Sequence, residues 1–114
     1  MKDAVARIEV FFSALGPSDL TRLGDFYTPD AYFKDPFNEV RGVAAIQGIF
    51  RHMFDALDTP RFVITTRVVD GYQCFLVWEF RFAFKSFHKG APQVVHGGSH
   101  LILAPDGRIQ SHRD

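Results

Sequence analysis

The chain of 114 residues has little cysteine, no excess of charge of either sign and no long apolar run. Its single cysteine, Cys74, excludes a framework of internal disulfides, and the hydrophobic residues around it predict a buried structural thiol. Lysine plus arginine and aspartate plus glutamate number 13 each, so no electrostatic surface for nucleic acid or an anionic membrane is expected. No apolar stretch approaches the roughly 20 residues of a membrane span.

The N-terminal Met1-Lys2-Asp3 lacks the uninterrupted apolar stretch and the cleavage pattern of a signal peptide. We therefore expect a cytoplasmic protein. A chain of this length suffices for one hydrophobic core, so we expect a single domain over residues 1–114 that folds without a metal or another cofactor.

Phenylalanine, by contrast, is abundant: the chain has 13, and aromatic residues make up 15% of it. Such rings either fill a core or line a pocket for an apolar ligand, and composition alone leaves both possibilities open. In the stretch around Trp78 and Phe80, apolar residues alternate with polar ones such as Glu79 and Arg81, which predicts a strand with one wet face. We expect Trp78 and Phe80 to reach the pocket.

Apolar residues at helical spacing occupy the first half of the chain, and β-branched or alternating residues occupy the second half. The predicted helices cover residues 4–15, 18–26 and 43–57, and the predicted strands cover residues 31–35, 61–69, 72–84, 93–103 and 108–114. Turns are predicted at Asp70-Gly71, near His88-Lys89-Gly90 and at Pro105-Asp106-Gly107. Residues 28–30 should end the second helix, and residues 37–42 should form a loop. Helices followed by an antiparallel meander predict an α+β fold with the helices on one face of the sheet.

Two stretches, residues 27–37 and 41–46, combine a helix end, a short strand, Asp35-Pro36 and a helix after Arg-Gly. This pattern resembles the nuclear transport factor 2-like superfamily and, within it, the ketosteroid isomerase and SnoaL-like branch. Residues 105–109 are similar to the last hairpin of the same family. The resemblance implies a cone, in which a strongly bent antiparallel sheet and three helices over its concave face enclose a pocket. It also implies that the last strand, which in the family continues past the aspartate, is truncated at Asp114.

The resemblance places Asp35 where ketosteroid isomerases keep a general-base aspartate that is also followed by proline. Such a base moves a proton between carbons next to a carbonyl, and the reaction needs hydrogen-bond donors for the enolate oxygen. The alternative for Asp35 is structural: its carboxylate accepts backbone N–H bonds in a turn around Pro36.

The donors of the family are largely replaced in this chain. A tyrosine of the first helix aligns with Phe11, a tyrosine of the third helix aligns with Phe50, and Tyr27 alone remains of the tyrosine network. The second donor of the family, a protonated aspartate, aligns with His100. Because losing an oxyanion donor typically costs a few kcal/mol of barrier, steroid isomerisation by the family's mechanism is not expected unless His100 alone supplies the donor.

A histidine pair is predicted across the last hairpin. If residues 105–107 form a three-residue loop, counting outward along the two strands places His100 opposite His112 and Gly98 opposite Asp114. Opposed side chains on one face lie about 5 Å apart at Cβ. The resemblance implies that these positions face the cavity, so together with the predicted base they would form one polar cluster in an aromatic pocket.

We expect Asp35, His100, His112 and Asp114 to be the catalytic residues, with the histidines as donors or proton shuttles. Asp114 could orient a histidine in the way that carboxylates support metal-bound histidines. One alternative is a pair of partly buried histidines without a reaction. Another is a metal held by His100, His112 and Asp35, although these three residues lack a recognisable spacing.

The leading hypothesis is an isomerase or cyclase that acts on a small apolar carbonyl or polyketide-like compound. The alternatives are a ligand-binding or dimerisation module of the same fold without turnover, and a hydrolase or dehydratase that activates water. The resemblance also implies a homodimer through the outer face of the sheet. The residues expected to line the pocket are Phe11, Tyr27, Phe33, Phe50, Phe54, Trp78, Phe80 and Gly98.

Overall fold

Six strands form one mixed sheet in the computed structural model, in the order β2-β1-β6-β5-β4-β3. The structure describes residues 1–86 and 89–114. The strands are β1 (Tyr27–Lys34), β2 (Glu39–Arg41), β3 (Leu57–Asp70), β4 (Gln73–Phe84), β5 (Gln93–Leu103) and β6 (Ile109–Arg113). Neighbouring strands are antiparallel except β1 and β6, which are parallel. The expectation of a purely antiparallel sheet is therefore corrected, because β1 joins the meander beside its last strand.

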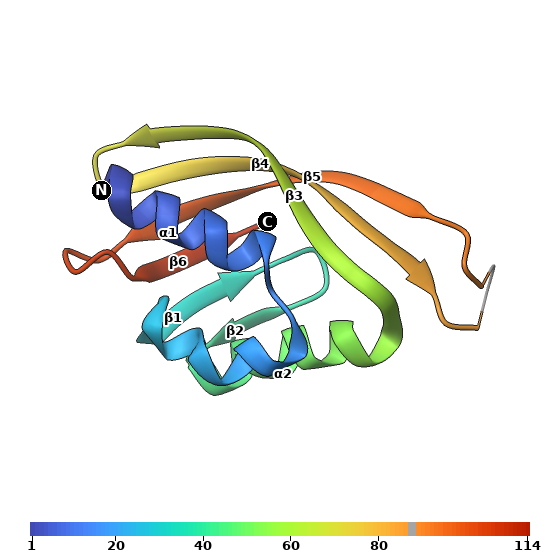
Figure 1. Cartoon of the computed structure of the whole chain (residues 1–114). Coiled ribbons are helices and arrows are strands. Elements are labelled where there is room, and N and C mark those ends of the chain that lie inside the picture. Colours follow the sequence, from blue (N-terminus) through green and yellow to red (C-terminus); the bar gives the residue numbers. More distant parts are fainter. Residues whose placement is uncertain (87–88) are drawn as a thin grey trace.

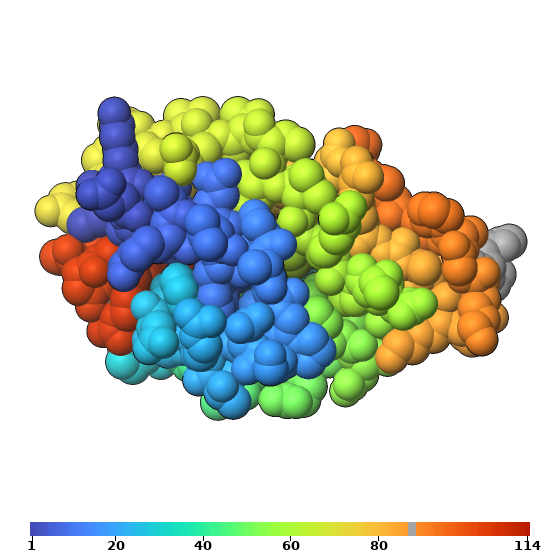
Figure 2. All heavy atoms as spheres, viewed as in Figure 1, coloured from blue at the N-terminus to red at the C-terminus, as the bar shows by residue number. Residues whose placement is uncertain are grey.

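The three helices expected from the sequence are confirmed as α1 (Lys2–Ser13), η1 (Pro17–Asp25, a 3₁₀ helix) and α2 (Val43–Ala56). They lie on one side of the sheet (Figure 1), because helical spacing gathers their apolar side chains on the face turned towards it. In the space-filling view the helices form a continuous layer, and the far ends of β4 and β5, in orange, extend beyond it (Figure 2). The α+β class is confirmed, whereas the cone shape stays a prediction.

Two boundaries near β1 differ from the expectation. Residues 28–30, expected to end a helix, belong to β1, and β2 occupies part of the expected loop at residues 37–42. β2 forms because Tyr32 pairs with Arg41 in a short hairpin. A strand this short leaves no alternation that a sequence pattern could reveal. Gly42, with φ of +96°, then turns the chain from β2 into α2.

Both turns predicted from Asp-Gly pairs are confirmed. The connection between β3 and β4 is short, because Asp70 already pairs with Gln73, and its first residue, Gly71, has φ of +58°. Before β6, Gly107 has φ of +89° and donates its N–H to the carbonyl of Ala104 at 2.9 Å. Glycine suits both positions, since a left-handed φ costs it little.

A β-bulge interrupts the pairing of β5 with β6 soon after this turn. The pairs Leu103–Ile109 and Ile102–Ser111 leave Gln110 as an extra residue on β6. Every later residue of β6 is therefore displaced by one position relative to an unbroken ladder. The three-residue loop was predicted correctly, but the count along the strands assumed that no bulge follows it.

The bulge overturns the predicted histidine pair. His100 pairs with Arg113, and His112 pairs with Leu101. Because side chains alternate between the two faces of a strand, a displacement of one residue puts His100 and His112 on opposite faces of the sheet. A metal site that joined both histidines with Asp35 is lost for the same reason.

The face of the sheet away from the helices carries exposed apolar side chains. Phe75, Val77, Val94 and Ile102 all keep more than a third of their surface accessible, since they are 45%, 37%, 46% and 40% exposed. The homodimer through this face stays a prediction.

Three smaller expectations complete the comparison. Cys74 is buried as expected, and burial raises the pKa of its thiol to about 11, so the reactive thiolate is disfavoured at neutral pH. Within the described ranges, no helix has the length and apolar character needed to cross a membrane. His88, expected in a turn, lies outside the described residues.

Candidate functional site

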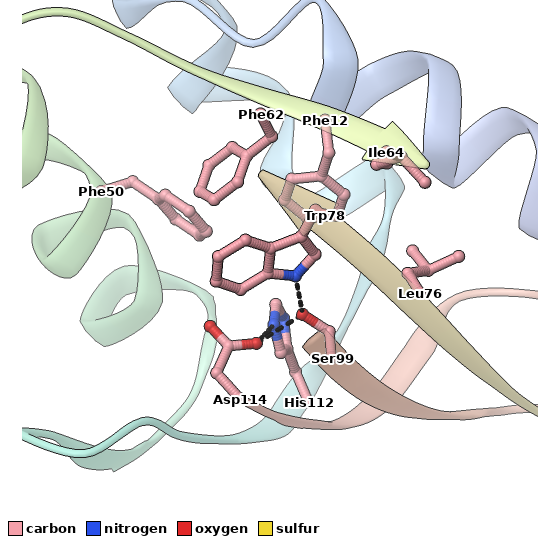
Figure 3. A pocket seen from close by; sticks show the side chains of 9 residues that line it. All are labelled: Phe12, Phe50, Phe62, Ile64, Leu76, Trp78, Ser99, His112 and Asp114. Atoms are coloured by element: carbon pink, nitrogen blue, oxygen red, sulfur yellow. Dashed lines mark hydrogen bonds and ion pairs between the residues drawn. The ribbon is translucent and has the colours of Figure 1, made fainter. Parts of the chain in front are cut away.

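A small pocket lies between the helices and the sheet (Figure 3). Its volume is about 30 Å³. Since a single water needs roughly 10–15 Å³ on this measure, the pocket as it stands admits only a compact group. The residues that line it are Phe12, Phe50, Phe62, Ile64, Leu76, Trp78, Ser99, His112 and Asp114. Four of them, Phe50, Trp78, His112 and Asp114, were singled out from the sequence.

Aromatic rings from four elements form much of the pocket wall. Phe12 comes from α1, Phe50 from α2, Phe62 from β3 and Trp78 from β4. The rings of Phe62 and Trp78 meet edge to face with centroids 5.4 Å apart, and those of Phe12 and Phe50 lie 6.0 Å apart. This packing orders the rings around the cavity and leaves apolar surface facing into it.

Phe12, rather than Phe11, is the α1 residue that lines the pocket. Phe11 stacks on Phe26 with ring centroids 3.9 Å apart, and the guanidinium of Arg22 lies 5.6 Å from the Phe11 ring. Successive residues of an α-helix point about 100° apart, since a turn takes 3.6 residues. An alignment that is off by one residue therefore selects the wrong face, and the predicted place of Phe11 is corrected.

A chain of four hydrogen bonds runs along the polar side of the pocket, and Figure 3 shows three of them. Trp78 Nε1 lies 2.9 Å from Ser99 Oγ, which lies 2.5 Å from Asp114 Oδ1. The same Asp114 oxygen lies 2.7 Å from His112 Nε2, and His112 Nδ1 lies 2.6 Å from the Tyr27 hydroxyl. Tyr27 and His112 are buried, whereas the Asp114 side chain is 23% exposed. Of these residues, Asp114 is therefore the one nearest to solvent.

The directions of these hydrogen bonds are fixed by two groups, one of which can only donate and the other only accept. The indole N–H of Trp78 can only donate, and the ionised carboxylate of Asp114 can only accept. Ser99 thus accepts from Trp78 and donates to Asp114. With its imidazole neutral, His112 donates from Nε2 to Asp114, and its Nδ1 then accepts from the Tyr27 hydroxyl. Each donor in this series of four hydrogen bonds is therefore engaged, whereas Asp114 Oδ2 accepts no hydrogen bond from the described residues.

Ser99 is the site residue that the sequence analysis missed. The bulge brings Ser99, not Gly98, beside Asp114. Gly98 lies on the outer face, where an added Cβ would be 2.8 Å from the exposed ring of Phe75, so its predicted place in the pocket is corrected. A signal was present in the sequence, because Ser99 shares its strand face with the buried Leu101.

Gly97 determines where the indole of Trp78 lies. The two residues pair across β5 and β4, and an added Cβ at Gly97 would be only 2.5 Å from Trp78 Cη2. The indole therefore lies directly against the β5 backbone, an approach that requires glycine. From this position its N–H reaches Ser99, two residues further along the strand.

Asp35 lies in the turn between β1 and β2. Its Oδ1 accepts the backbone N–H of Phe37 at 2.8 Å and that of Asn38 at 2.6 Å. The side-chain amide of Asn38 also contacts both carboxylate oxygens, at 3.1 and 3.2 Å. This is the structural role weighed for Asp35 as an alternative, in which the carboxylate holds a turn. Its catalytic role stays a prediction, and Asp35 is not among the residues that line the pocket.

His100 lies on the outer face of the sheet. Its Nε2 lies 2.8 Å from Gln73 Oε1, which can only accept, so this nitrogen donates. The side chain shares this face with Phe75, its partner on β4. His100 therefore cannot act with His112 in the pocket, and its predicted place there is corrected.

The remaining residues predicted for the pocket lie around it rather than in its wall. The ring of Tyr27 is parallel to that of His112, and the ring of Phe33 lies 4.6 Å from it. Phe54 packs on the core, and Phe80 stacks on a wall residue, Phe62, at 4.8 Å. These side chains support the residues that line the cavity.

The buried Tyr27 hydroxyl gives a testable pH effect. Burial, with a smaller contribution from the charge of Asp114, raises the pKa of Tyr27 well above its usual value. The unfolded chain loses this proton more easily, so the stability linked to Tyr27 is complete below tyrosine's ordinary pKa of about 10 and declines as the pH rises further.

We expect an alkaline ultraviolet titration to show one of the three tyrosines ionising only as the protein unfolds. Tyr27→Phe should remove this late step and leave the earlier ones. Ionisation of all three tyrosines in the folded protein would contradict the buried hydrogen bond.

Proteins with a nuclear transport factor 2-like fold have the same architecture. A hypothetical protein with a ketosteroid isomerase-like fold from Catenulispora acidiphila, in complex with trimethylamine, matches with a TM-score of 0.80 and 17% identity, over 97% of this chain and 82% of that one. A putative SnoaL-like polyketide cyclase from Shewanella putrefaciens matches with a TM-score of 0.76 and 18% identity, over 99% and 86%. An NTF2-like protein of unknown function from Burkholderia pseudomallei matches with a TM-score of 0.81 and 14% identity, over 99% and 87%.

At these identities the solved structures define the fold class alone. The SnoaL-like domain model matches residues 8–112, and the chain therefore belongs to the SnoaL-like domain family. No curated protein matches it. The family membership confirms the resemblance drawn from the sequence, and the ligand and the reaction have to be argued from the pocket itself.

Proposed function

We propose that this chain binds a small, largely apolar molecule in the pocket of Figure 3, with Asp114 as the polar anchor. The observation that carries the proposal is the contrast within the hydrogen-bond chain. Its donors are all engaged, whereas Asp114 Oδ2 has no donor among the described residues. A ligand N–H or O–H that reaches this oxygen would gain a charge-assisted hydrogen bond, and the apolar part of the ligand would cover aromatic surface.

The fold and the size of the pocket support a compact ligand. The Catenulispora acidiphila protein of the same fold is in complex with trimethylamine, which supports the binding of small molecules as one use of this architecture. A larger molecule would have to displace wall residues, because the cavity measures only about 30 Å³. We therefore favour the module that binds a small ligand without turnover over the enzyme.

Acid–base catalysis by Asp114 is the second candidate function. Its free oxygen could accept a proton from a carbon next to a carbonyl, while His112, supported by Tyr27, holds the carboxylate in place. The structural neighbour described as a putative SnoaL-like polyketide cyclase supports catalysis as a second possible function. An enolate would also need donors, and those of Trp78 and Ser99 already serve the network.

Replacing Asp114 by asparagine is expected to weaken ligand binding by about 10- to 100-fold, because a hydrogen bond to a charged group is worth about 1.5–3 kcal/mol. Trp78 is the only tryptophan of the chain and lines the pocket, so its fluorescence reports occupancy directly. Wild type and variant would be titrated with a set of small alcohols, amines and ketones, and dissociation constants compared.

Asp35→Asn is the matched comparison, since it makes the same chemical change in the turn. We expect it to leave the dissociation constants within about twofold of wild type, because its carboxylate serves Phe37 and Asn38. A larger loss in Asp35→Asn than in Asp114→Asn would show that the anchor has been assigned to the wrong aspartate. Conversion of a ketone by wild type but not by Asp114→Asn would favour the catalytic candidate.

A further inference from the structure

The geometry points to a ligand class: the pocket is built to take a small alkylammonium cation, whose charged head lies among the aromatic rings beside Asp114. This inference rests on the proposed function, because it names what the pocket binds. It is carried by three features of the described pocket residues: their charge, their rings and their lack of free donors.

The pocket contains one acidic side chain, and the only basic side chain among the described residues that line it is the imidazole of His112, which carries no charge in the hydrogen-bond arrangement given above. Asp114 is its only acidic residue, and neither lysine nor arginine occurs among the nine residues that line it in the described chain. The Asp114 carboxylate interacts with Ser99 and His112 through one oxygen, which leaves Oδ2 available. A carboxylate bordered by apolar walls attracts a cation more strongly than it would in water, since the effective dielectric constant is lower.

The rings around the carboxylate complement a cation in a second way. Figure 3 shows Phe50, Phe62 and Trp78 around the cavity, with the Asp114 carboxyl group at its edge. The face of an aromatic ring carries negative partial charge and attracts a cation within about 6 Å of its centroid, tryptophan most strongly. Quaternary ammonium groups are recognised by such sets of rings, because they are weakly hydrated and need no hydrogen bond.

The hydrogen-bond chain argues against anionic ligands. A carboxylate, phosphate or enolate needs donors, and the donors of Trp78, Ser99 and His112 are all engaged in the network. An anion would also lie beside Asp114 and be repelled by it. A cation needs only what the pocket offers, which is π-faces and one free carboxylate oxygen.

The size of the cavity selects a compact head group. About 30 Å³ leaves no room for a flat polycyclic molecule unless the walls move. Asp114 is more exposed than His112, with side-chain exposures of 23% and 7%, so the pocket is more accessible from the Asp114 side. A trimethylammonium head is larger than about 30 Å³, so it enters from that side only when the surrounding wall side chains move apart, and the rest of the ligand stays in solvent.

Choline and its uncharged isostere, in which a carbon atom replaces the ammonium nitrogen, test the inference. Both have the same shape and the same hydroxyl, so any difference in affinity reports the charge. We expect choline to bind wild type at least about tenfold more tightly than the isostere. Dissociation constants would be measured by Trp78 fluorescence and by calorimetry, so that a binding event without an optical change is still detected.

Asp114→Asn is expected to reduce this preference severalfold, because the rings, which also attract a cation, stay in place. Asp70→Asn is the matched control, because it deletes the same charge at an exposed position on the β3–β4 hairpin, and it should keep the full preference. Circular dichroism would establish that both variants are folded, and the comparison of choline with its isostere on wild type requires neither variant.

The outcomes separate this inference from the proposed function. If the isostere binds as tightly as choline, the cation inference is overturned and the small-ligand pocket stands. If neither molecule binds and none of the neutral alcohols or ketones binds either, both are overturned. A choline preference that keeps its full wild-type size in Asp114→Asn would overturn the role of the carboxylate.

Discussion

Replacing Gly97 by alanine is expected to abolish ligand binding in the pocket and to lower the free energy of unfolding by about 1–3 kcal/mol. The new Cβ would lie 2.5, 2.7 and 3.0 Å from three atoms of the Trp78 six-membered ring. The indole therefore has to move, and its hydrogen bond to Ser99 breaks with it. The Trp78 emission spectrum, ligand titrations and urea denaturation would measure the three consequences on one variant.

Gly98→Ala is the matched control on the next residue of β5. Its Cβ would meet the exposed ring of Phe75 on the outer face, and that ring can rotate away into solvent. The Cβ would also lie 3.2 Å from the carbonyl oxygen of Leu76, a contact that a small shift of the backbone relieves. Neither glycine has a left-handed φ, so backbone strain does not distinguish the two variants. We expect Gly98→Ala to keep wild-type ligand binding. Loss of binding in Gly98→Ala with retention in Gly97→Ala would reverse the assignment of the strand faces.

The second large effect is expected from the hydrogen bond between Tyr27 and His112. Tyr27→Phe leaves the buried Nδ1 of His112 without a donor, and His112→Phe leaves the buried Tyr27 hydroxyl without an acceptor. Each single change should cost about 1–3 kcal/mol, which is the penalty for an unsatisfied buried polar group. The double variant removes both polar groups and should cost clearly less than the sum of the two.

A double-mutant cycle by urea denaturation measures this coupling directly. We expect a coupling energy of about 1–2 kcal/mol, within the range found for residues in one network. Strictly additive losses would contradict the hydrogen bond, because they would mean that the two side chains contribute to stability independently.

Much of the fold could be predicted because local signals were strong. The helical spacing of Val5, Ile8 and Phe12 matches the buried face of α1. The Asp-Gly pairs ending in Gly71 and Gly107 marked turns, since both glycines adopt φ values that other residues rarely do. The alternation in β4 put Trp78 on the inner face, where it lines the pocket.

The pairing of strands distant in sequence was harder to predict. β1 lies parallel to β6, and the register of Phe33 against His112 joins residues from opposite ends of the chain. No local pattern encodes that choice, because each strand separately satisfies its own alternation. The short β2 was not predicted either, because a strand of three residues makes too few contacts to require an apolar sequence pattern.

The candidate site was partly misplaced by one bulge. The residues His100, Leu101, Ile102 and Leu103 put apolar side chains on both faces of β5, so either pairing with β6 looked acceptable from hydrophobicity. The extra residue Gln110 decides the register.

The consequence of the bulge for chemistry is an exchange of partners. An unbroken ladder would have put His100 beside His112, and the bulged one puts Ser99 beside Asp114. The polar cluster of the pocket therefore consists of a serine, a carboxylate and one histidine. Its available group is an acceptor, which is why binding is favoured over enolate chemistry.

A crystal structure of the protein with choline tests the central claim most directly. The account predicts electron density for the trimethylammonium head between the rings of Phe50, Phe62 and Trp78, with Asp114 Oδ2 as the nearest charged atom. The hydrogen bonds from Ser99 and His112 to Oδ1 should remain. Density at another place on the chain, or an occupied pocket in which Asp35 has left its turn to contact the ligand, would contradict it.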